Sequence, residues 1–163
     1  MIKFILPLIV LTSVLSMTAH SGHPGEEETM GGMMHPSKPI PSGKTIPSLS
    51  LALSEDNMSG YNLELHTQHY RFVIPHRTKG DEVLEGHAHL YINGKKIQRV
   101  YGHYVHIPSS YLVKGVNQIT VSLNDHDHGA WTLPDQSELY ATLIIDLRKE
   151  DVVMNHFSST GNK

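Results

Sequence analysis

Three short histidine-rich segments carry the side chains best suited to chemistry in this chain. The first contains His87 and His89, inside the run GHAHLYING that starts at Gly86. On a β-strand, residues two apart project from the same face, about 6.5–7 Å apart along the strand. Both imidazoles can therefore converge on one metal ion. The alternative is a pair of exposed histidines with no ligand.

The second segment covers residues 101–106 and contains His103 and His106. It follows the dipeptide Asn93-Gly94, which is a strong signal for a two-residue hairpin turn. Pairing the strands on either side of this turn places His103 at the same end of the hairpin as His87. We therefore expect His103 to be the fourth ligand of a site built on the first segment. His106 lies three residues later and falls on the opposite face of an undistorted strand.

The third segment, Asn124–His128, alternates carboxylates with imidazoles at the end of a predicted strand. A loop here can close over the face that carries the first histidine pair, so we expect His126 to be the third ligand. Asp125 and Asp127 can act outside the ligand set by accepting a hydrogen bond from an imidazole and holding its tautomer. The alternative is an ordinary solvated turn.

The composition limits the chemistry that these segments can perform. The chain of 163 residues has 13 histidines, 13 Lys and Arg, 16 Asp and Glu, and no cysteine. The absence of cysteine excludes disulfides, thiolate catalysis, cysteine-ligated zinc, iron–sulfur clusters and the blue-copper centre. The net charge of −3 gives no basic surface for nucleic acid. Any metal must be held by imidazole, carboxylate, thioether or backbone oxygen.

Residues 1–19 predict a cleaved signal peptide. A positive start at Lys3 precedes a mostly apolar run that ends at Met17. The run is too short for a permanent membrane anchor. Cleavage after Ser16 or after Ala19 is compatible with the small-residue rule for signal peptides. We expect export to the periplasm or secretion.

Residues 20–46 predict a flexible leader, because they are rich in Gly, Pro, Ser and Glu and lack an apolar period. The leader also contains imidazoles and thioethers. Thioethers favour Cu(I), and imidazoles accept either oxidation state of copper. We expect these side chains to form an auxiliary copper site, and the alternative is a polar linker. They are His20, His23, Met30, Met33, Met34 and His35.

Residues 47–148 predict an all-β domain, an antiparallel β-sandwich of immunoglobulin-like or cupredoxin-like form. Short runs alternate apolar and polar residues between turn signals, as Ala88, Leu90 and Ile92 do opposite the first histidine pair. That pair should lie on the face away from the core, where substitutions cost little stability. Residues 149–163 are expected to be a polar tail.

The runs GYNLELHTQHYRFVIP, GHAHLYINGKKIQRVYGHYVHIP and ITVSLNDHDH together resemble an uncharacterised family of exported bacterial β-sandwich domains with the motif G-H-A-H-L-Y-x-N-G. The resemblance spans Gly60–His128 and places His87, His89 and His126 on the family's histidines. Asp125 follows Asn124 directly, one residue short of the family's spacing. There is a looser similarity to cupredoxin-like periplasmic copper-binding proteins. The resemblance implies a sandwich fold and export but no activity.

These observations favour an exported metal-binding protein that stores, delivers or detoxifies copper, with zinc as the second choice. Its partners would be the metal ion and another periplasmic copper protein. A non-metal adhesion or ligand-binding sandwich with pH-sensitive histidines is the first alternative. A copper oxidase is the second, if cleavage after Ala19 makes His20 the N-terminal ligand. Binding is favoured over catalysis, because a flexible leader cannot preorganise ligands.

Overall fold

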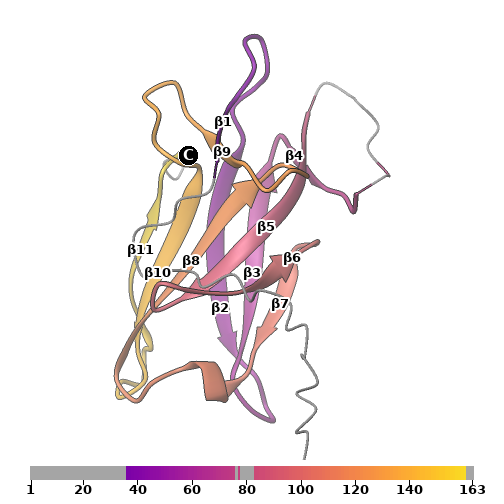
Figure 1. Cartoon of the computed structure of the whole chain (residues 1–163). Helices are drawn as coiled ribbons and strands as arrows, with labels where there is room; N and C mark the ends of the chain where they lie inside the picture. The colour runs from indigo at the N-terminus through magenta and orange to yellow at the C-terminus, as the bar shows by residue number, and fades with distance from the viewer. Residues whose placement is uncertain (1–35, 76, 78–82, 161–163) are drawn as a thin grey trace, which may run out of the picture. The chain divides into compact units, whose positions relative to one another are not determined.

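The computed structural model describes residues 36–75, 77 and 83–160. They form an all-β sandwich in which an eight-stranded sheet packs on a three-stranded sheet (Figure 1). The predicted fold class is thus confirmed. Within these residues, no helix has the length and apolar character needed to cross a membrane.

The larger sheet contains β1 (Ser37–Pro39), β4 (Tyr70–Phe72), β5 (Leu84–Ile92), β6 (Lys95–Val100), β8 (Val116–Asn124), β9 (Ala130–Thr132), β10 (Tyr140–Asp146) and β11 (Val153–Ser158). The smaller sheet contains β2 (Ser48–Glu55), β3 (Tyr61–Gln68) and β7 (Tyr104–Ile107), and a 3₁₀ turn, η1, spans Ser109–Tyr111. Most strand pairs are antiparallel, whereas β1–β9 and β4–β5 are parallel.

Strand β5 carries the first histidine pair and has three neighbours in the larger sheet (Figure 1). It pairs with β4 near its start, with β8 along one side and with β6 along the other. The β5–β6 hairpin turns at Asn93 and Gly94, whose φ angles are 52° and 79°. Positive φ at both turn residues is the requirement that the Asn-Gly dipeptide meets, so the predicted hairpin is confirmed.

The core lies between the two sheets and follows the alternation seen in the sequence. Ala88, Leu90 and Ile92 of β5 are buried in it, while the residues between them point to the outer face of the larger sheet. Most of the other core residues come from β2, β3, β8 and β10 in the same manner. They include Leu49, Leu63, Leu65, Ile119, Val121, Leu123, Ala141, Leu143 and Ile145.

Strands also form outside the predicted sandwich boundaries. Residues 37–39, assigned to the leader by their composition, form β1 and pair with β9. Residues 153–158, assigned to the polar tail, form β11 and pair with β10. Nearly all side chains of both strands are exposed, so neither strand shows the alternation that marks a half-buried strand. The predicted signal peptide lies outside the described residues.

Candidate metal centre

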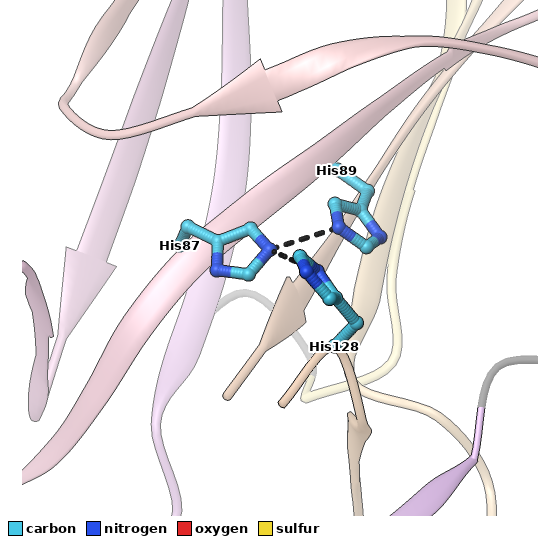
Figure 2. Close-up of side chains that lie close together, drawn as sticks. All are labelled: His87, His89 and His128. Atoms are coloured by element: carbon cyan, nitrogen blue, oxygen red, sulfur yellow. Dashed lines mark hydrogen bonds between the residues drawn. The ribbon is translucent and has the colours of Figure 1, made fainter. Parts of the chain in front are cut away.

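Three imidazoles converge on one point at the outer face of the larger sheet (Figure 2). The Nε2 atom of His87 lies 2.9 Å from Nε2 of His89 and 3.1 Å from Nδ1 of His128. All three nitrogens lie within 4.8 Å of one another. A tetrahedral ion with metal–nitrogen bonds of about 2.0–2.1 Å requires ligand nitrogens about 3.3 Å apart. The group could therefore hold a metal ion with small side-chain adjustments.

His87 and His89 share the outer face of β5, as the strand period predicts, but both are fully buried, with 0% of their surface exposed. The expectation that their replacement costs little stability assumed that side chains on this face are exposed, and the burial of both residues contradicts that assumption. His128 covers both of them, with its ring centroid 4.9 Å from that of His87 and 5.6 Å from that of His89. The Tyr101 ring lies 5.3 Å from His87. His128, from the turn after β8, and the Tyr101 ring thus cover histidine side chains that β5 alone would leave exposed.

The start of β5 is held in place by close backbone packing against β8. The Tyr70 hydroxyl lies 2.9 Å from the carbonyl oxygen of His87 and 2.7 Å from that of Asn124. A Cβ atom on Gly86 would lie only 1.9 Å from the Asn124 carbonyl oxygen. Only glycine permits this approach, so the residue before His87 helps to set the position of the first imidazole.

The turn after β8 positions His128 through one carboxylate. Asp125 Oδ1 accepts hydrogen bonds from the backbone N–H groups of Asp127 at 3.0 Å and Gly129 at 2.7 Å. Its other oxygen lies 3.0 Å from Lys38 Nζ. His128 has a φ of 67°, a left-handed conformation that few non-glycine residues adopt. The carboxylate therefore stabilises the turn that directs the third imidazole toward the other two.

Strand β1 packs against this turn. The backbone N–H of Ala130 donates to the Pro36 carbonyl at 2.9 Å. A Cβ atom on Gly129 would lie 3.0 Å from Lys38 Cβ and 3.2 Å from the Pro36 oxygen. A larger residue here would require β1 or the turn to shift by a few tenths of an ångström, so glycine is the residue that fits this close approach without adjustment. The segment that the sequence assigned to the leader thus supports the position of His128.

The hydrogen bonds around the cluster show which tautomers a metal would require. His87 Nε2 faces both other rings, and its buried Nδ1 has no hydrogen-bond partner among the described residues. His89 Nδ1 lies 3.4 Å from the Tyr91 hydroxyl. For Nε2 of His89 to bind a metal, the ring proton must be on Nδ1. The Tyr91 hydroxyl oxygen can accept a hydrogen bond from that N–H group. Tyr91 is therefore placed to hold the metal-binding tautomer of His89.

Two of the three cluster imidazoles have a lowered pKa, which favours their neutral form. Burial, followed by repulsion from neighbouring positive charge, lowers the pKa of His87 to about 4. Burial also lowers the pKa of His128, with repulsion from Arg99 and Lys96 contributing to the shift. A neutral imidazole has a free lone pair, and metal binding requires that form. The nitrogens of both rings are therefore available to a metal at neutral pH.

His126, the expected third ligand, lies outside the group of three. Both of its ring nitrogens are buried and lack hydrogen-bond partners among the described residues. Its charge also contributes to the lowered pKa of His87, so it lies near the centre. Strand β8 ends at Asn124, and in the turn that follows it is His128, two positions after His126, that approaches the other two imidazoles.

His103, the expected fourth ligand, lies beside the other sheet. Its Nδ1 is 2.9 Å from the carbonyl oxygen of Leu65, and its ring packs edge-on against Phe72 at 5.1 Å. The β5–β6 pairing ends at Val100, after which the chain crosses to β7, which pairs with β3. The predicted position of His103 assumed that the strand after the hairpin turn continues past Val100. It does not continue, so His103 does not lie beside His87.

Two groups of predicted site residues remain: the hydrogen-bond acceptors Asp125 and Asp127, and the auxiliary copper residues of the leader. The Asp125 carboxylate binds the backbone of the turn and Lys38, while the exposed Asp127 donates its backbone N–H to Asp125. Neither makes a hydrogen bond to a cluster imidazole among the described residues. The auxiliary copper residues His20, His23, Met30, Met33, Met34 and His35 lie outside the described residues.

Comparison of the chain with protein-family models, with curated proteins and with solved structures finds no match. The functional argument therefore depends on the residues of this chain.

Proposed function

We propose that this chain is an exported metal-binding protein that handles copper, with zinc as the second candidate. One observation carries the proposal: the ring nitrogens of His87, His89 and His128 converge within 4.8 Å of one another. Buried histidines normally find separate hydrogen-bond partners. Here three of them share one point, which is the arrangement that a common ligand requires.

The choice of copper follows from the donor set. Imidazole nitrogens bind copper, zinc, nickel and iron, and affinity for divalent first-row ions is greatest for Cu²⁺. The leader adds thioethers at Met30, Met33 and Met34, which suit Cu(I). A chain with both donor types could hold copper in either oxidation state. Storage or delivery to a second periplasmic copper protein is the role that this capacity supports.

Binding is proposed in preference to catalysis. A catalytic metal generally lies beside a cavity large enough to enclose most of an organic substrate. A groove of about 1200 Å³ borders β2, β3 and β11, and none of the three cluster histidines lines it. The buried state of His87 and His89 also favours retention of an ion over turnover.

Calorimetric titration with Cu²⁺ and Zn²⁺ tests the proposal. The wild-type protein should bind one ion at the ordered centre, and His128→Ala should lose that binding event. His156→Ala is the matched control, because His156 is an exposed histidine on β11 outside the cluster. Equal binding by the wild type and His128→Ala would contradict the proposal.

Export is part of the proposal and rests on residues 1–19. Mass spectrometry of protein from the periplasm of a Gram-negative host should show an N-terminus after Ser16 or Ala19. Retention of the full-length chain in the cytoplasm would contradict this part. The same measurement also decides whether His20 becomes the N-terminal residue that a copper oxidase would require.

The groove supports a second candidate, a ligand-binding sandwich. It has a volume of about 1200 Å³, and its lining includes His66, His69 and His103. Because histidine side chains gain a proton near neutral pH, histidines that line a groove would make ligand binding there sensitive to pH. A wild-type protein that binds neither copper nor zinc would place this candidate first.

A further inference from the structure

The three-histidine centre leaves one coordination position without a ligand from the described residues. The group of metal-ligating side chains found there contains His87, His89 and His128 only. Zinc sites in proteins are almost always four-coordinate, and sites with three protein ligands take water or another small ligand in the fourth position. What fills that position depends on the charges around it.

Strand β6 places two cations beside the centre. In the β5–β6 ladder, Arg99 pairs with His89, and Lys96 pairs with Tyr91. Directly opposed residues of an antiparallel pair project from the same face. Both cationic side chains therefore belong to the outer face that carries the cluster. Their charge reaches the centre, since both contribute to the lowered pKa of His87.

These two cations are not neutralised within the described part of the chain. Neither the Arg99 side chain nor the Lys96 side chain forms an ion pair or a hydrogen bond with another described residue. Asp125, a buried acid in the turn that carries His128, is already paired with Lys38 and with the backbone of that turn. A divalent ion on three neutral imidazoles would add two positive charges. The loaded centre would therefore attract an anion strongly.

We propose that the metal-loaded centre binds a small carboxylate. One carboxylate oxygen completes the coordination of the metal ion, and the other accepts hydrogen bonds from the Arg99 guanidinium. The planar guanidinium matches the geometry of a carboxylate, whereas Lys96 adds only a point charge. This inference rests on the proposed function, because the carboxylate needs the metal ion. It adds the chemical class of the ligand that occupies the open position.

The test uses Co²⁺, which takes tetrahedral imidazole sites and has visible absorption bands that respond to the fourth ligand. Acetate is titrated into the Co²⁺-loaded wild type, Arg99→Gln and Lys95→Gln. The Lys95 variant is the matched control, since Lys95 pairs with Ile92 and belongs to the opposite face of the same strand. We expect acetate to shift the spectrum, and we expect its affinity to fall about tenfold or more in Arg99→Gln alone.

The outcomes separate this inference from the proposed function. Wild-type protein that takes up no Co²⁺, Cu²⁺ or Zn²⁺ would overturn both. Protein that binds Co²⁺ with an acetate response that is absent, or is equal in Arg99→Gln and wild type, would overturn the inference alone. A similar loss in Lys95→Gln would show that net charge, and not the position of Arg99, governs the response. Co²⁺ affinity in Arg99→Gln should equal or exceed that of the wild type, because a nearby positive charge is removed.

Discussion

The Asp125 carboxylate oxygen lies 2.7 Å from the backbone nitrogen of Gly129, and this contact closes the turn on which His128 sits. The turn brings one imidazole over two others that a strand already holds. Two different structural features thus position the three imidazoles. The period of β5 sets His87 and His89, and a carboxylate-stabilised turn sets His128.

The first prediction concerns Asp125. Asp125→Ala should weaken metal binding about 10–100-fold, as is typical of residues that support metal ligands. The physical reason is that the N–H groups of Asp127 and Gly129 lose their acceptor, so His128 is no longer held at the cluster. Calorimetric titration with Zn²⁺ measures the change.

Asp135→Ala provides the control for that variant. Asp135 accepts the backbone N–H of Ser137 at 3.0 Å in an exposed turn away from the centre. Its removal should leave metal affinity unchanged. The role assigned to Asp125 would be contradicted if the two variants bound Zn²⁺ with the same affinity.

The second prediction separates His128 from His126. His128→Ala should abolish binding at the ordered centre, since it removes one of three converging nitrogens. His126→Ala should reduce affinity much less, because His126 lies outside that group. Competition with a chromogenic chelator measures both affinities. The reverse order of effects would show that the metal draws His126 into the ligand set.

The third prediction concerns the stability of the metal-free protein against pH. His87 has a pKa of about 4 in the folded state, below the ordinary value of 6.5. Between these values the unfolded chain binds more protons, so the free energy of unfolding falls as the pH is lowered from about 6.5 to about 4. The loss from this residue should reach about 3 kcal/mol.

Urea denaturation at a series of pH values measures this loss. His87→Gln removes one titrating group and should make the dependence shallower in that range, leaving the part that comes from His128. His156→Gln replaces an exposed histidine and should retain the wild-type dependence. A wild-type stability that is constant between pH 7 and pH 4 would contradict the assignment of a buried neutral His87.

The fourth prediction concerns the leader. Replacement of Met30, Met33 and Met34 by Leu should lower Cu(I) binding and leave Cu(II) binding nearly intact, because thioethers favour Cu(I). Titrations with competing ligands specific for each oxidation state measure the two affinities. Equal losses in both states would indicate that the leader and the ordered centre form a single site.

The fold could be predicted largely from alternation and turn chemistry. The alternation of Ala88, Leu90 and Ile92 with polar residues predicts a strand with one buried face. The dipeptide Asn93-Gly94 predicts the hairpin turn that the structure contains. The edge strands β1 and β11 could not be predicted in this way. Backbone pairing holds them, and their exposed side chains carry no periodic signal.

The site could be predicted only in part, for a related reason. His87 and His89 share a face because the strand period is two, which the sequence shows directly. The choice of His128 over His126 depends on a left-handed turn residue and on hydrogen bonds to Asp125. The spacing of Asp125 and Gly129 is a sign of such a turn, but it does not specify which histidine points inward. His103 was misplaced because no local pattern marks where β6 leaves the sheet.

The most direct test of the central claim is anomalous diffraction from crystals grown with Zn²⁺. The account predicts one strong peak about 2.0–2.1 Å from Nε2 of His87, Nε2 of His89 and Nδ1 of His128. A peak bound by other side chains, or no peak near these three nitrogens at saturating Zn²⁺, would contradict it.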